Sequence, residues 1–477
     1  KKAFLSLVFT ILPILTFAQE KGLDQQFNEA FKPIADAWGG IVFYPITFSD
    51  TVSMPIVIIM LLLSGLLFSI LFKFVNIRNF HVSINILRGK YDDLDHHTVD
   101  EKAMVNIVDG DAVDTIAIEG HEGEVTHFQA LTAALSGTVG LGNIAGVAIA
   151  ISIGGPGATF WMIIAGLLGM SSKFVECTLG VQYRDVGEDG TVYGGPMYYI
   201  SKGLKERGFK VVGKIAAVVF AIFCIGGSFG GGNAAQSNQA TVVLKELLGL
   251  ESTAAGAIIG VVLAILVGII IIGGIKRIAQ VTEKVVPFMA GLYVLACLYI
   301  LGINFSLIDD AISLIFREAF NPTAMGVGGF IGVLLVGFKR AAFSNEAGAG
   351  SASIAHSAVK TKYSASEGLV ALLEPFIDTV LICTMTALVI IIFNFGGDAS
   401  GSTIFQYGGD GSGGVFIEGA RLEGAGITSA AFAEYIPYSK VFLTIAVVLF
   451  AVSTMISWSY YGLQSWKFLF GRGKKAV

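Results

Sequence analysis

Glycine and oxygen-bearing side chains come together in an apolar run at residues 136–146, which read SGTVGLGNIAG. Each glycine weakens a helix by about 1 kcal/mol relative to alanine, so we predict a broken helix here. Within lipid, freed backbone groups are tolerated only where they line a cavity. Such a break offers carbonyls to a cation and N–H groups to a carboxylate, and Thr138 and Asn143 add side-chain oxygens. The alternative is a glycine face for close helix packing.

A second string of this kind, FKRAAFSNEAGAGSAS, covers residues 338–353. Lys339, Arg340 and Glu346 are costly in hydrocarbon, so we expect them to face protein or water. The small residues at 347–353 permit either a break or close packing. The residues expected to meet a substrate here are Asn345, Gly348 and Gly350.

Amide side chains follow a third glycine cluster at residues 226–239, which read GGSFGGGNAAQSNQ at the predicted end of a span. We predict that this segment faces a substrate, with Gln236 as the preferred contact. Polar residues of an ordinary membrane interface are the alternative.

Hydroxyl groups gather at residues 451–461, AVSTMISWSYY. Such hydroxyls usually bond to carbonyls of their own helix, but hard cations also prefer oxygen ligands. Thr454 and Trp458 are four residues apart and share one helix face. A tryptophan in the interfacial belt is the other explanation for Trp458.

Acidic residues also lie inside apolar runs. Glu374 and Asp378 are four residues apart and therefore share a face of one helix. They suit either a proton relay or a structural pair that bonds to neighbouring helices, and Glu176 leaves the same choice open.

Composition places these segments in a membrane protein. Of the 477 residues 54% are hydrophobic and 14% charged, against about 25% charged in soluble domains. The net charge of −5 gives no basic footprint for nucleic acid. No phosphate loop, nucleotide fingerprint or nucleophile elbow appears, and neither the histidines nor the four cysteines show metal-ligand spacing. We therefore expect an all-α polytopic membrane protein that is not an enzyme and holds no organic cofactor.

The chain contains a series of apolar runs near the ~20 residues that a span needs. Residues 1–18 resemble a signal peptide, with a membrane span as the alternative, and 19–126 form an N-terminal segment. The spans are predicted near 54–75, 128–153, 158–180, 213–236, 254–275, 285–303, 327–355, 366–394 and 438–462.

Lys and Arg alternate between successive loops, as the positive-inside rule requires. Loops 76–127, 181–212 and 276–284 and the C-terminal tail are basic, whereas 241–253 and 395–437 are poor in Lys and Arg. We therefore expect the basic loops on the inner side of a bacterial plasma membrane and the mature N-terminus outside.

An internal repeat relates two parts of the chain at an offset of 202 residues. Asn143 aligns with Asn345, and Phe174-Val-Glu176 with Phe376-Ile-Asp378. By the predicted topology the copies run in opposite directions, which is typical of secondary transporters. Repeat one would be 127–303, with core helices 1–5, and 304–477 a partial second repeat with core helices 6–8. We expect two further C-terminal helices to be missing; a natural eight-plus-one arrangement is the alternative.

Four strings resemble the alanine/glycine:cation symporter family, also called the sodium:alanine symporters. They are SGTVGLGNIAGVA (136–148), GGPMYYI (194–200), GNAAQSNQ (232–239) and FKRAAFSNEAGAGSA (338–352), and the likeness covers about 127–470. The family implies a LeuT-type inverted-repeat fold, here with one extra N-terminal helix, sodium as coupling ion, and alanine or glycine as substrate.

The resemblance also implies roles for particular residues. Substrate-binding residues would be Thr138, Gly140, Asn143, Gly231, Gln236, Asn345, Gly348, Gly350, Thr454 and Trp458. Sodium would be held by Thr138, Val139, Asn143, Ala451, Ser453 and Thr454.

The sequence thus predicts a sodium-coupled symporter of small neutral amino acids that works by alternating access. One rival is a proton-coupled permease of the same fold that uses Glu346, Glu374 or Asp378. A rival of another class is a channel or a receptor-like binding protein in the lipid bilayer.

Overall fold

The computed structural model describes residues 23–49, 52–91, 107–108, 111–112, 123–187, 189–250, 252–320, 329–396, 403–408 and 411–473. The predicted signal peptide at 1–18 lies outside these residues. The chain divides into two units, residues 1–60 and 61–477. The first contains α2 (Leu23–Val42) and the antiparallel hairpin of β1 (Pro45–Ser49) and β2 (Val52–Pro55), in which Ile46 lies opposite Met54. Helix α3 (Ile56–Leu71) begins there and continues into the second unit.

The sequence predicts nine spans, of which 54–75 corresponds to the shorter apolar helix α3, and 327–355 contains a helix of 17 residues, Gly329–Asn345. Six helical stretches in the described part of the second unit are long and apolar enough to cross a membrane. Their elements are α9 (Gly157–Gln182), α11 (Lys210–Phe229) with π-helical η3 (Gly230–Ala234) and α12 (Ala235–Leu248), α13 (Thr253–Ile271), α14 (Gly274–Ile303), α18 (Ser364–Ala371) with α19 (Leu373–Pro375), π-helical η6 (Phe376–Cys383) and α20 (Thr384–Asn394), and α22 (Ser439–Phe470). The bent pair α7 (His127–Thr138) and α8 (Val147–Gly154) makes a seventh.

Two span boundaries differ from the prediction. The proposed loop 276–284 is the first part of α14, and the span predicted to end at 236 continues through α12 to Leu248. In both cases the hydrophobic run stops at charged or amide side chains. Lys, Arg, Glu and Gln are nevertheless good helix formers, so the helix extends past the apolar segment into its polar flank.

Predicted loops also contain short helices and hairpins. Helix α10 (Pro196–Glu206) has proline in its first turn, where the missing N–H costs nothing. Helix α15 (Ile308–Phe320) has Asp309 and Asp310 in its first turn and Arg317 in its last, which complements the helix dipole. The remaining ones are α4 (Val75–Arg78), α5 (Phe80–Leu87), α21 (Ala425–Tyr435) and the two-stranded pairs β3 (Ile107–Val108) with β4 (Asp111–Ala112), β5 (Asp185–Val186) with β6 (Val192–Tyr193), and β7 (Gly414–Ile417) with β8 (Ala420–Glu423).

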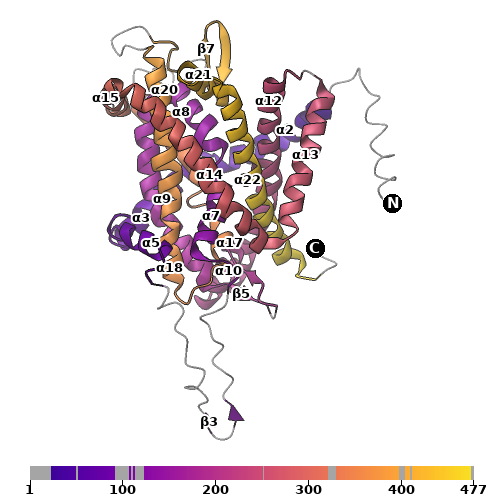
Figure 1. Cartoon of the computed structure of the whole chain (residues 1–477). Helices are drawn as coiled ribbons and strands as arrows, with labels where there is room; N and C mark the ends of the chain where they lie inside the picture. Colours follow the sequence, from indigo (N-terminus) through magenta and orange to yellow (C-terminus); the bar gives the residue numbers. More distant parts are fainter. Residues whose placement is uncertain are drawn as a thin grey trace. The chain divides into compact units, whose positions relative to one another are not determined.

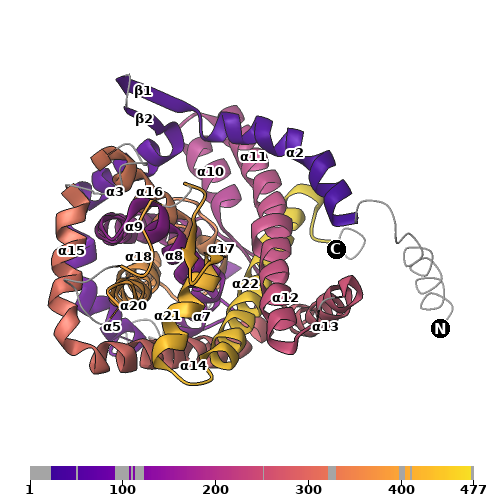
Figure 2. The same ribbon diagram turned by 90° about the horizontal axis from the view of Figure 1, so that it is seen from above.

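The first glycine-rich segment lies in the interior of the second unit. In Figure 2, α8 and α18 lie inside, with α15, α14 and α12 around them, and Figure 1 shows α9 and α20 running alongside one another. Val147 and Ala148 of α8 are fully buried, whereas Ile258 and Val261 of α13 are 64% and 60% exposed. Exposed aliphatic side chains on a long apolar helix suit contact with lipid. The first glycine string, at 136–146, is therefore shielded from lipid by other helices, whereas Gly348 and Ala349 of the second string are exposed in the described chain.

Candidate binding site at two helix breaks

The first glycine string breaks its helix, as predicted. Helix α7 ends at Thr138, and Val139 has extended backbone angles, with ψ at 98°. The chain resumes as π-helical η2 (Gly142–Gly146), which runs into α8. The two halves of this span are bent by 53° relative to one another.

Glycine is required at position 140 because α22 lies directly against the break. A Cβ atom on Gly140 would lie 2.9 Å from Thr454 Oγ1, closer than real Cβ contacts. Of the predicted site residues, Gly140 and Thr454 therefore lie against one another here. Ala451, one turn earlier on α22, is fully buried.

Asn143 fastens the break in place. Its Oδ1 accepts a hydrogen bond from Gly140 N at 2.8 Å, and its Nδ2 donates to Asp378 Oδ1 at 2.7 Å and to Ser344 Oγ at 3.2 Å. The residue is fully buried. Its side-chain oxygen thus satisfies one backbone N–H that the break frees from the helix.

The second glycine string also interrupts a helix. Helix α16 (Gly329–Asn345) stops at Asn345, and α17 (Ala352–His356) follows. Between them, Glu346, Gly348 and Gly350 have φ angles of 54°, 91° and 83°, in the left-handed region. Only glycine adopts such angles without strain, which explains the two glycines. Of the cations predicted to face protein or water, Lys339 is exposed and Arg340 half-buried on α16.

Asn345 repeats the arrangement of Asn143. Its Oδ1 accepts from Ala347 N at 3.0 Å, and its Nδ2 donates to Thr379 Oγ1 at 2.9 Å. Thr379 Oγ1 in turn donates to Asp378 Oδ2 at 2.7 Å. The two asparagines, 202 positions apart (345 minus 143), are therefore connected through neighbouring residues of η6.

Two acidic residues, Glu176 and Glu346, lie beside the second break, and the sequence alone did not decide the role of either. The carboxylate of Glu176 on α9 lies near the backbone N–H groups of Gly348 and Gly350, and its Oε2 is buried without a hydrogen-bond partner in the described chain. Glu346 accepts from Trp458 Nε1 at 3.0 Å and from the Ser351 hydroxyl. The second break therefore has two carboxylates beside it, and Trp458 and Ser351 donate to that of Glu346.

The hydroxyls of α22 bond to backbone carbonyls, which is the alternative that the sequence left open. Ser453 Oγ and Thr454 Oγ1 each donate to Phe450 O at 2.9 Å, and Ser136 Oγ donates to Ser453 O at 2.7 Å. Thr138 Oγ1 donates to Leu135 O at 3.4 Å. A hydroxyl that donates its proton still has lone pairs, so these bonds leave oxygen free for a cation.

The third glycine cluster lies in the middle of a long helix, not at its end as predicted. A Cβ on Gly232 would lie 2.3 Å from Trp458 Cβ, so η3 packs tightly against α22. Gln236 Nε2 donates to Gly231 O at 3.2 Å, and its Oε1 is buried without a hydrogen-bond partner in the described chain. An unpaired buried acceptor is costly, so this oxygen is suited to a ligand that donates hydrogen bonds.

A cavity of about 440 Å³ lies between α12, α21, β8 and α22. It reaches Ile144, next to Asn143, and Gln239, one turn beyond Gln236. On α22 it extends from Lys440 to Val447, two turns before Thr454. The cavity therefore leads from one end of the bundle toward the residues that the sequence assigns to substrate.

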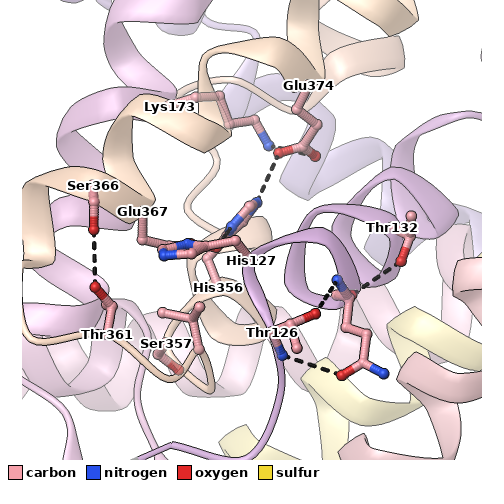
Figure 3. Close-up of polar contacts among 12 residues, drawn as sticks. Thr126, His127, Thr132, Lys173, His356, Ser357, Thr361, Ser366, Glu367 and Glu374 are labelled. Carbon is pink, nitrogen blue, oxygen red and sulfur yellow. Dashed lines mark hydrogen bonds and ion pairs between the residues drawn. The ribbon is translucent and has the colours of Figure 1, made fainter. Parts of the chain in front are cut away.

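Sequence reasoning missed a chain of buried acids and bases, shown in Figure 3. His127 and His356 both contact Glu367, and Lys173 contacts Glu374 at 3.2 Å. The histidines gave no metal spacing and were set aside. The one usable signal was the presence of Lys173 and Glu374 within apolar runs, because buried charges require partners.

Comparisons with known proteins place the chain among transporters. Residues 43–477 match the model of the sodium:alanine symporter family. The sodium/alanine symporter AgcS of Methanococcus maripaludis is 42% identical over 354 residues, which cover 74% of this chain and 72% of that protein. A putative sodium/proton-dependent alanine carrier protein of Bacillus subtilis, YrbD, is 38% identical over 74% of this chain and 69% of its own. A probable sodium/glutamine symporter of the same organism, GlnT, is 30% identical over 431 residues, which cover 90% of this chain and 77% of that protein.

Proposed function

Because the chain belongs to the sodium:alanine symporter family, a family of membrane transporters, we propose that it carries alanine or glycine across the membrane together with sodium. The observation that carries this proposal is the pair of helix breaks. Two asparagines at equivalent positions of the repeat each accept from a freed backbone N–H, and Asp378 and Thr379 connect them. Breaks of this kind at an interface between repeats are typical binding sites of secondary transporters, and they support a LeuT-type inverted repeat.

The chemistry of the two breaks suits a zwitterion. At the first break, the positive end of the helix that resumes at η2, just beyond Gly140, favours a carboxylate. The unpaired Oε1 of Gln236 and nearby backbone carbonyls accept hydrogen bonds from an ammonium group. Glycines and Trp458 around this space leave room for a methyl side chain and little more.

Sodium would take oxygen ligands between the first broken helix and α22. Thr138, Val139, Asn143, Ala451, Ser453 and Thr454 offer carbonyl, amide and hydroxyl oxygens, which hard cations prefer. The approach of Gly140 to Thr454 supports this assignment, since it brings the two groups of ligands together. Sodium there would join two elements and thereby favour one conformation over the other.

Alternating access would connect this site to the two sides of a bacterial plasma membrane in turn. The cavity that ends near Ile144 and Val447 would be the outer approach. The opposite end, with α10 and the β5–β6 pair, carries Lys202 and Arg472 and would be cytoplasmic by the positive-inside rule.

The experiment is uptake of labelled alanine by liposomes that contain the purified protein. One arm imposes an inward sodium gradient, and the other replaces sodium with potassium and imposes an inward proton gradient. We expect uptake in the sodium arm, with unlabelled glycine as competitor; glutamine is included because one relative is named for it. Unchanged alanine binding with and without sodium would contradict sodium coupling, and single-channel currents would indicate a channel.

Proton coupling is the second candidate, because a buried acid lies at the first break and one relative is named as sodium/proton-dependent. Asp378→Asn separates the two. Under sodium coupling, uptake should still depend on the sodium gradient, at a rate lowered by the loss of one oxygen that accepts from Asn143 or Thr379. A proton-coupled carrier should instead lose uptake driven by the proton gradient. Glu318→Gln, a buried acid on α15 away from the breaks, is the matched control.

A further inference from the structure

The buried acid–base chain has no role in transport as proposed so far (Figure 3). Glu367 contacts a histidine with each of its carboxylate oxygens: Oε2 faces His127 Nδ1, and Oε1 lies 2.5 Å from His356 Nδ1. The chain continues from His356 Nε2 to Glu374 Oε2 at 3.6 Å, and from Glu374 Oε1 to Lys173 Nζ at 3.2 Å.

The two histidines belong to the two broken helices. His127 is the first residue of α7, and His356 is the last residue of α17. Glu367 lies on α18, at the beginning of the long stretch Ser364–Asn394. One carboxylate therefore ties a half of each broken helix to the same neighbouring span.

The solvent exposure of the side chains indicates that the contact between His127 and Glu367 is the one that can open. The side chain of His127 is 11% exposed, whereas those of His356 and Glu367 are fully buried. His356 also faces Glu374 and so retains an acidic partner if its contact with Glu367 changes. His127 lies at the edge of the chain, where movement of α7 would admit water to the carboxylate.

A carboxylate inside protein is stable only when it is paired and hydrogen-bonded. If α7 withdraws His127, one oxygen of Glu367 loses its partner and must be hydrated. The contact between His127 and Glu367 therefore has two favourable states: closed, with the carboxylate paired and shielded from water, or open, with the carboxylate hydrated. A contact with two such states can hold one conformation and release it.

We propose that Glu367 is a positioning residue that clamps α7 and α17 together and holds the α10 end of the bundle closed until His127 is released. The inference rests on the proposed alternating access, in which that end opens toward the cytoplasm. The His127–Glu367–His356 clamp binds neither substrate nor sodium. It sets how often the inner end opens.

Protonation would strengthen the clamp, because an imidazolium beside a carboxylate makes a charge-assisted hydrogen bond. An imidazole in water titrates near pH 6.5. Acid should therefore favour the closed end, and mild alkali should favour its opening. Other titratable groups interact with the clamp or with its continuation through Glu374 and Lys173. All of them stay unchanged in every variant below: Lys173, Glu374, Glu176, Cys177, Glu346, Asp378 and Tyr461.

The test measures access to a thiol on the inner half of α7. Thr132, five residues after His127, is 2% exposed, and the native cysteines are all buried. Thr132→Cys is labelled with a water-soluble maleimide in detergent, without sodium or alanine, between pH 6 and 8. Rates are divided by those of Lys205→Cys, an exposed position, to remove the intrinsic pH dependence of the thiol.

We expect slow labelling of Thr132→Cys at pH 6 and a rate several-fold higher at pH 8. Adding Glu367→Ala should raise the rate at pH 6 about tenfold and remove the pH dependence, and His127→Ala should do the same while keeping the Glu367–His356 contact. His127→Asn, which keeps a donor that cannot titrate, should label slowly at every pH. Glu318→Gln, also a buried carboxylate, should behave like the parent.

Equal labelling in the parent, Glu367→Ala and His127→Ala would overturn the inference, and so would faster labelling in Glu318→Gln. In liposomes, Glu367→Ala should raise KM for external alanine several-fold, since fewer molecules then face outward, with little change in kcat. Labelling needs no substrate, so the clamp can hold even if alanine uptake fails. Sodium-driven uptake by the parent protein tests the proposed function separately.

Discussion

At the scale of single residues, the site depends on side chains that replace the missing helical hydrogen bonds. Asn143 and Asn345 each accept from a backbone N–H near their own break and donate to η6. A buried N–H without an acceptor is costly, so each asparagine stabilises a backbone shape that would otherwise be unfavourable. The break can thus keep a fixed, non-helical backbone inside the protein.

Gly140→Ala tests the closeness of the first break to α22. The new methyl would lie 2.9 Å from Thr454 Oγ1, so the break or α22 must shift. We expect sodium-driven alanine uptake to fall at least tenfold, while the protein still elutes as a single folded species.

Gly146→Ala is the matched control, because an added Cβ there meets no described atom within 4 Å. It lies in the same broken span and should keep most of the uptake. Equal loss in both variants would mean that helix propensity, and not contact with Thr454, limits transport.

At the scale of elements, π-helical segments and breaks bring side chains of separate helices into one place. η3 interrupts the long α11–α12 helix where it packs on Trp458, and Trp458 then donates to Glu346 beside the second break. Gln236 follows directly in α12. Packing at η3 therefore positions both a helix of the site and the indole that faces it.

Gly232→Ala should destabilise this junction. A Cβ 2.3 Å from Trp458 Cβ cannot be accommodated without separating η3 and α22. Overpacking of this kind typically costs about 1–3 kcal/mol. We expect a lower melting temperature in detergent and altered tryptophan fluorescence.

Gly226→Ala, six residues earlier in α11, provides the comparison. Its added Cβ has no described neighbour within 4 Å, and alanine is the better helix former. Its melting temperature should equal or exceed that of the parent. A decrease as large as that of Gly232→Ala would rule out the packing argument.

At the scale of the molecule, the end of α22 is tied to the β5–β6 pair. Arg472 donates to Asp185 at 2.7 Å and stacks over Tyr193, with 3.9 Å from its guanidinium carbon to the ring centre. Lys202 of α10 donates to the other Asp185 oxygen. Partial burial opposes ionisation of Asp185, but the hydrogen bonds from Lys202 and Arg472 hold its pKa below the usual value.

This lowered pKa predicts how stability depends on pH. The ion pairs contribute above the unfolded pKa of about 3.9 and are lost as the pH falls through the lower folded value. More than a third of each side chain is exposed, so the contribution is at most about 1 kcal/mol. Melting curves of the parent and Asp185→Asn should differ at neutral pH and converge below about pH 4. A difference that stays constant down to pH 3 would contradict this assignment.

Much of the architecture follows from the sequence alone. Long apolar runs give the spans, because hydrophobicity and length act locally along the chain. The glycines at 137–146 and 348–350 gave the helix breaks for the same reason, since helix propensity is a local property. The motifs in those segments identified the family.

Only the tertiary structure determined what each polar side chain does. Glu176 near the second break, Asp378 bonded to Asn143, and Glu367 between two histidines all bring distant segments of the chain together. Each of these contacts depends on which helix faces meet and on how closely the helices pack, because a shift of about 1 Å breaks a hydrogen bond. Hydrogen bonds weaken steeply when their distance or angle departs from the optimum. The same sequence pattern is therefore compatible with a structural pair or with a binding site, and only the packing of the helices decides between them.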